Sequence, residues 1–160
     1  ISDSIIKLSK RYKFKVFQQT NPKNYEKLKS FYLINNIENQ LFNFSEKISS
    51  FMSQSNICIT RAGASTLGEL IFLNIAHIAI PLPLANDNHQ FENASYYEGK
   101  GCNWILNQSQ LVDDILTNKL IGIIENKGEY LEKRKNMRIF SYQNTWNNIN
   151  QKIISIINEN

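Results

Sequence analysis

The chain has 160 residues, enough for one domain with a proper core and too few for two large ones. Its hydrophobic fraction of 42% and charged fraction of 20% are typical of a globular protein and exclude a largely disordered one. The net charge of +4 fits a solvated, Lys-rich surface, with a basic face for anionic lipid or a phosphate substrate as the alternative. Lys and Arg are scattered and no nucleic-acid-binding motif occurs, which argues against a nucleic-acid partner.

Helices and strands are expected to alternate about every 20 residues. Ile5, Ile6 and Leu8 are spaced like one face of an opening helix. Strands are predicted at 13–19, 40–44, 56–60, 77–82 and 102–106, and further helices at 24–32, 45–55, 65–73, 89–100, 108–120, 127–140 and 144–158. This alternation predicts an α/β fold with a doubly wound parallel sheet. An opening helix with no strand before it suggests the C-terminal portion of a longer protein.

Cysteine and hydropathy patterns say little about chemistry. Cys58 and Cys102 lie in short apolar stretches and are expected to be small buried hydrophobic residues. No Cys or His spacing suggests a metal site. With only these two cysteines, a reduced, cytoplasmic protein fits best. No apolar run reaches the length of a membrane span.

The first informative junction joins the strand that ends at Thr60 to the following helix. Small residues there let a phosphate approach the backbone, and a helix N-terminus offers unpaired N–H groups. Ser65 and Thr66 add hydroxyl groups, Arg61 adds a charge, and Glu69 could hold a ribose diol. The alternative interpretation is an ordinary capping box formed by Thr66 and Glu69.

A second junction follows the next strand and is crowded with polar side chains. His89, Gln90 and Asn93 open a helix there and could hydrogen-bond to sugar hydroxyls. The alternative is an Asp or Asn N-cap with a solvated helix face. His77, which begins a strand, is interpreted as a core or edge residue. No nucleophile elbow, Walker loop or zinc-protease motif occurs, so the pattern favours a site that binds and positions a substrate.

Three segments, 44–69, 78–94 and 99–111, resemble the C-terminal, nucleotide-sugar-binding half of glycosyltransferase family 28. They carry the pattern Arg-x-Gly-Ala-x-Thr-x-x-Glu followed by His-Gln-x-x-Asn-Ala. The most similar members transfer GlcNAc from UDP-GlcNAc to lipid I in peptidoglycan synthesis. Asn74 departs from the family pattern, in which Gly is usual at that position.

The resemblance implies that residues 1–160 are a UDP-GlcNAc-binding domain, a Rossmann-like half of a GT-B enzyme. Such a fragment lacks its first strand and the N-terminal acceptor domain, which holds the general base. Alone, it is expected to bind the donor weakly and to be inactive. The implied enzyme is inverting, uses neither metal nor cofactor, takes a lipid-linked acceptor and is peripheral at the inner face of the cell membrane. The implied contacts are Ser45 near uracil, Arg61 beneath the diphosphate, Ser65 and Thr66 at the diphosphate, Glu69 at the ribose, and His89, Gln90 and Asn93 toward GlcNAc.

Two other interpretations remain open. The chain could be a separate catalytic subunit that docks a membrane-bound partner, as in the two-chain enzyme that acts on dolichol-linked GlcNAc. It could also be a non-enzymatic nucleotide-binding or interaction module, which would tolerate the loss of Glu69 without losing its ligand.

Overall fold

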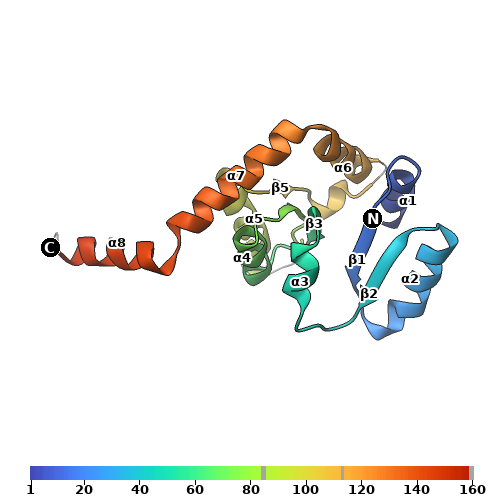
Figure 1. Ribbon diagram of the computed structural model, residues 1–160, viewed down its shortest axis with the longest axis horizontal. Helices are drawn as coiled ribbons and strands as arrows, with labels where there is room; N and C mark the ends of the chain where they lie inside the picture. Colours follow the sequence, from blue (N-terminus) through green and yellow to red (C-terminus); the bar gives the residue numbers. More distant parts are fainter. Residues whose placement is uncertain (84–85, 113, 159–160) are drawn as a thin grey trace.

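The structure is a computed structural model that describes residues 1–83, 86–112 and 114–158. Helices and strands alternate as far as β5, after which the chain is helical (Figure 1). The strands are β1 (Lys15–Gln19), β2 (Glu38–Phe42), β3 (Ile57–Thr60), β4 (Ala76–Ala79) and β5 (Trp104–Ile105). The helices are α1 (Ser2–Ser9), α2 (Pro22–Ile34), α3 (Ile48–Ser53), α4 (Ala64–Phe72), α5 (His89–Gly99), α6 (Ile115–Glu125), α7 (Lys127–Gln143) and α8 (Trp146–Asn158), with short 3-10 turns η1 (Asn86–Asn88) and η2 (Gln108–Gln110).

All strand pairs in the described residues are parallel, as the alternation predicts. β1 pairs with β2, with Phe17 opposite Gln40. β3, β4 and β5 form a second sheet in that order, with Ile59 opposite Ile78 and Ile78 opposite Trp104. Parallel neighbours need crossover connections, which α2, α4 and α5 supply.

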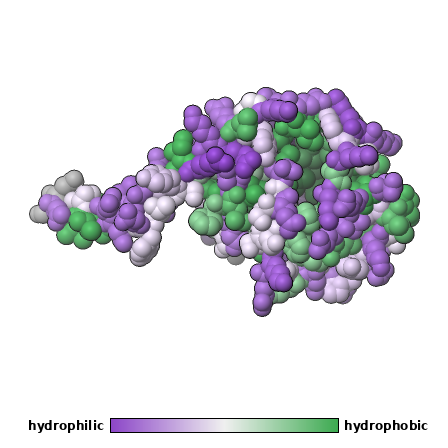
Figure 2. Space-filling view, in the orientation of Figure 1, coloured by the Kyte–Doolittle hydropathy of each residue, from purple (hydrophilic) through white to green (hydrophobic). Residues whose placement is uncertain are grey.

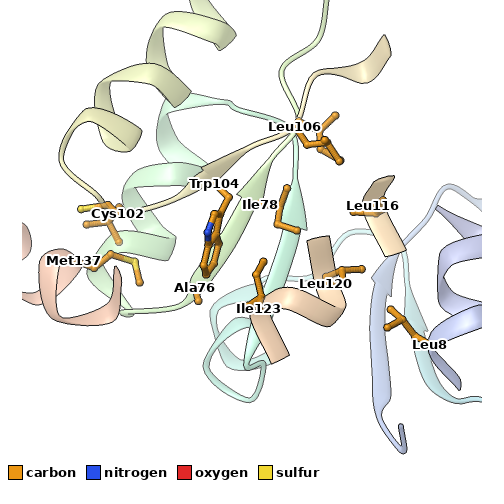
Figure 3. Packing of buried hydrophobic residues seen from close by; sticks show 12 residues of the cluster. Leu8, Ala76, Ile78, Cys102, Trp104, Leu106, Leu116, Leu120, Ile123 and Met137 are labelled. Atoms are coloured by element: carbon orange, nitrogen blue, oxygen red, sulfur yellow. The ribbon is translucent and has the colours of Figure 1, made fainter. Parts of the chain in front are cut away.

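The main core packs the second sheet against α6 and α7 (Figure 3). Its buried residues are Leu8, Ile71, Ala76, Ile78, Ile80, Cys102, Trp104, Leu106, Leu116, Leu120, Ile123 and Met137. His77 on β4 is fully buried, which confirms it as a core residue. Both cysteines are free; Cys102 is buried, whereas Cys58 is only half-buried.

Two predicted helices differ from the structure. The predicted helix 108–120 is divided into η2, which a reciprocal capping box of Asn107 and Gln110 opens, and α6, which begins at Ile115. The predicted helix 45–55 begins later, at Ile48, because the Ser45 Oγ atom accepts a hydrogen bond from the Lys47 N–H (3.1 Å) and closes a turn ahead of it.

An apolar groove of about 1320 Å³ lies between β1 and β3. Every residue of both strands lines it, together with side chains from α1, α3, α6 and α7. In the described residues β1 pairs only with β2 and β3 only with β4, so each strand turns an unpaired edge toward the other. The space-filling view shows a green, apolar hollow bordered by purple, polar side chains (Figure 2).

The last helix, α8, projects away from the rest of the molecule (Figure 1). None of its residues is buried, and its apolar side chains include Trp146, Ile153 and Ile157. Within the described ranges, no helix combines the length and the apolar character needed to cross a bilayer.

Candidate functional site

The start of α4 has no side-chain cap. Gly63 is the N-cap in an extended conformation (φ −69°, ψ 136°), and the first helical bond runs from the Leu67 N–H to the Gly63 carbonyl (3.0 Å). The N–H groups of Ala64, Ser65 and Thr66 therefore have no helical acceptor, and the helix dipole adds positive potential there. The capping-box interpretation is wrong, because the helix begins before Thr66.

The two faces of α4 have different roles. Leu67, Leu70 and Ile71 are buried and hold the helix against the sheet and α3. Ser65 and Glu69 are exposed and four residues apart, which places them on one face with Cβ atoms about 5–6 Å apart. The exposed face thus presents a hydroxyl group near the uncapped amides and a carboxylate one turn further on.

Arg61 bridges the ends of two strands. Its Nη1 atom lies 3.4 Å from the carbonyl oxygens of both Ile80 and Pro81, which follow β4. These are long hydrogen bonds, and they place the guanidinium charge at the edge where β3 and β4 end.

Side chains of α5 hold the same turn from the other side. The Gln90 Oε1 atom accepts from the backbone N–H groups of Ala62 (3.3 Å) and Leu82 (3.0 Å). The Asn93 Nδ2 atom donates to the Ala62 carbonyl (3.2 Å). The structure therefore brings Gln90 and Asn93 to the β3–α4 turn, through backbone partners that no sequence signal marks.

The start of α5 is built from left-handed residues. Asp87 and its neighbour Asn88 have φ values of 51° and 56°, a conformation that Asp and Asn tolerate better than most residues do. Asn88 is the N-cap, as the alternative interpretation has it, although its side chain makes no capping hydrogen bond. His89 is exposed as the first residue of α5.

Ser45 lies in the chain segment that leads into α3. It is half-buried and precedes α3, which packs on α4 through Met52 and Leu70.

Residues 1–83, 86–112 and 114–158 contain no cluster of three or more His, Cys, Asp or Glu side chains placed to hold a metal ion.

Proteins of known sequence resemble all or most of this chain. The UDP-N-acetylglucosamine--N-acetylmuramyl-(pentapeptide) pyrophosphoryl-undecaprenol N-acetylglucosamine transferase of Pelagibacter ubique is 56% identical over 160 residues, all of this chain and 45% of that protein. The protein with the same name from Rickettsia canadensis is 34% identical over 76% of this chain and 34% of its own length. The chain therefore spans less than half the length of these relatives.

Solved structures confirm the fold. The crystal structure of Acinetobacter baumannii MurG matches 86% of this chain and 39% of its own with a TM-score of 0.75 at 24% identity, as expected for a Rossmann-like half of a GT-B transferase. The family model described as the glycosyltransferase family 28 C-terminal domain matches residues 1–151. The resemblance seen in the sequence is thus confirmed, and the chain belongs to glycosyltransferase family 28 through its C-terminal domain.

Proposed function

We propose that this chain is the UDP-GlcNAc-binding domain of an inverting transferase that moves GlcNAc onto undecaprenyl-pyrophosphoryl-MurNAc-pentapeptide. The observation that carries the proposal is the uncapped start of α4, with Ser65 and Glu69 exposed beside it. The 56% identity to a transferase named for this reaction supports the same substrates.

The diphosphate of the donor binds at the first turn of α4. Free N–H groups of a helix N-terminus are a general anion site, and the hydroxyl groups of Ser65 and Thr66 add donors. Arg61 lies at the adjoining strand ends and contributes a full positive charge beneath the phosphates. When the acceptor hydroxyl attacks C1 of GlcNAc, this fixed positive potential stabilises the departing UDP without a metal ion.

The positions of the same elements assign the contacts to the ribose, uracil and GlcNAc groups of the donor. Glu69, on the face of α4 that carries Ser65, accepts hydrogen bonds from the ribose hydroxyls. Ser45, before α3, contacts uracil mainly through its backbone. His89 and Gln90, at the start of α5, face the GlcNAc hydroxyls.

The acceptor site and the general base belong to the remainder of a longer protein. The relatives are more than twice as long as this chain, since it covers 45% or less of each. The groove between β1 and β3 supports the same assignment, because a further parallel strand seated there would pair with both open edges and join the two sheets. The lipid-linked acceptor places the whole enzyme peripherally at the inner face of the cell membrane.

Calorimetric titration of UDP-GlcNAc into the wild-type chain and Glu69→Ala tests the proposal. The variant is expected to lose about 1–3 kcal/mol of binding free energy, because a charge-assisted hydrogen bond to ribose is removed. Glu132→Ala is the matched control, since it removes the same charge from the exposed face of α7. Equal affinity of Glu69→Ala and wild type would rule out the ribose contact, and a folded wild-type chain without binding would overturn the proposal.

A further inference from the structure

Both backbone hydrogen-bonding groups of one residue in the β3–α4 turn are held by α5. The Ala62 N–H donates to the Gln90 Oε1 atom, and its carbonyl accepts from the Asn93 Nδ2 atom. Gln90 and Asn93 are three residues apart and therefore share one face of α5. Ala62 itself is fully buried in a small core with Leu67 and Ala94.

The hydrogen bond from Asn93 to the Ala62 carbonyl sets the direction of the Gly63 N–H. The chain contains no cis peptide in its described residues, and in a trans peptide the C=O and N–H bonds point in opposite directions. Because the Ala62 carbonyl points toward Asn93, the Gly63 N–H points away from α5. Gly63 is the N-cap of α4, so Asn93 orients the amide that precedes the uncapped first turn.

The oxygen and the nitrogen of the Gln90 carboxamide can make separate contacts. Its Oε1 atom is occupied by two backbone donors, Ala62 and Leu82, and this identifies which end of the amide is the oxygen. The Nε2 end of the same amide lies on the other side of the carboxamide carbon. One side chain can therefore clamp the ends of β3 and β4 and still offer N–H donors to a ligand.

We infer that Asn93 is a positioning residue for the donor diphosphate, acting through the Ala62–Gly63 peptide, whereas Gln90, the sugar contact of the proposed function, holds the same turn through its side-chain oxygen. This inference rests on the proposed function. It separates two side chains on one face of α5: Asn93 governs the affinity for any ligand that carries the diphosphate, whereas the Gln90 Nε2 atom distinguishes UDP-GlcNAc from UDP.

NMR titrations of the ¹⁵N-labelled chain with UDP-GlcNAc, UDP and uridine test this assignment, because they measure weak binding and report on the Gly63 amide directly. Asn93→Ala removes the donor to the Ala62 carbonyl. We expect a shifted Gly63 amide in the free protein and an affinity for UDP and UDP-GlcNAc lowered by one common factor, about 5- to 30-fold. The affinity for uridine, which lacks the diphosphate, stays unchanged.

Gln90→Glu and Asn93→Asp form a matched pair, since each adds one carboxylate to the same face of α5. Gln90→Glu keeps an acceptor for both backbone N–H groups and loses the amide donor, so the ratio of UDP-GlcNAc to UDP affinity falls. In Asn93→Asp that ratio stays at its wild-type value while both affinities fall.

Three results would overturn the inference. A lower affinity of Asn93→Ala for UDP-GlcNAc with unchanged UDP affinity would make Asn93 a sugar contact. If Asn93→Ala lost equal affinity for uridine and for UDP, the substitution would have disrupted the domain in general. If its affinity for all three ligands were unchanged, Asn93 would have no role in binding. The absence of UDP binding to the wild-type chain would instead refute the proposed function itself.

Discussion

At the scale of single residues, the core holds a titratable side chain, His77, that the proposed site does not use. His77 is fully buried on β4, and its Nδ1 atom lies 2.9 Å from the Ile75 carbonyl. Among the described residues its Nε2 atom has no hydrogen-bond partner. Burial lowers the pKa of this imidazole below its usual value, and the Lys133 charge lowers it further against the opposing Ile75 hydrogen bond. At neutral pH His77 is therefore uncharged in the folded protein.

This burial predicts a loss of stability in mild acid. The unfolded chain protonates His77 at about pH 6.5, whereas the folded chain does so only at lower pH. Below about pH 6.5 the unfolded state binds more protons, so the free energy of unfolding falls as the pH drops, by at most about 1.4 kcal/mol per pH unit. Urea unfolding between pH 7 and pH 5 should show a smaller loss in His77→Asn than in wild type. If the free energy of unfolding fell equally with pH in His77→Asn and in wild type, the buried, neutral state of His77 would be contradicted.

At the scale of elements, three helices end in the same way. The residues Asn36, Asn74 and Gly101 follow α2, α4 and α5 with φ values of 51°, 57° and 68°. In α4 the Ile75 N–H bonds to the Leu70 carbonyl (2.8 Å), and in α5 the Cys102 N–H bonds to the Tyr97 carbonyl (2.9 Å). These are Schellman motifs, which need a left-handed residue after the helix.

Gly101→Ala should destabilise the domain. An added Cβ atom would lie 2.5 Å from the Asn136 Nδ2 atom, which donates to the Gly101 carbonyl, and the left-handed backbone is unfavourable for Ala. We expect a loss of about 1–3 kcal/mol in the free energy of unfolding. Gly99→Ala, inside α5, is the control, because its added Cβ would have no atom within 4 Å apart from its chain neighbours and the backbone of its own helix. This variant should gain about 0.4–1 kcal/mol. Equal values for the two variants in thermal unfolding would contradict this account.

Local patterns were enough to predict most elements, because burial on one face imposes a period of 2 or 3.6 on the sequence. These patterns failed where a contact between residues far apart in the sequence determines the local structure. Gln90 bonds to Ala62, 28 residues away, through a backbone N–H group that no side-chain pattern marks. The capping box was wrong because the extended Gly63 lets α4 start earlier. Asn74, an apparent departure from the family pattern, fits its place because Asn is among the side chains that best tolerate a left-handed backbone.

At the scale of the whole molecule, the groove between β1 and β3 divides the parallel strands into two sheets. It is lined by apolar side chains that include Phe17, Phe51 and Ile59, and it extends to Thr66 in the first turn of α4. A strand seated in it would therefore reach the proposed diphosphate site. The fold is consequently expected to be most stable, and the site most complete, within a longer protein.

Filling the groove should hide apolar surface. We predict that the chain alone increases the fluorescence of anilinonaphthalene sulfonate, a dye that binds exposed apolar surface. A hybrid in which residues 1–160 follow the preceding part of the Pelagibacter ubique relative should bind less dye and unfold at a higher temperature. Equal dye binding and equal unfolding temperatures in the two proteins would argue against a seated strand.

The most direct test of the central claim, that the start of α4 holds the donor diphosphate, is a map of backbone amide shifts in the ¹⁵N-labelled wild-type chain on addition of UDP-GlcNAc. We predict the largest changes at Gly63, Ala64, Ser65 and Thr66, with smaller ones around Gln90. A folded chain whose amides shift elsewhere, or do not shift at millimolar UDP-GlcNAc, would contradict the claim.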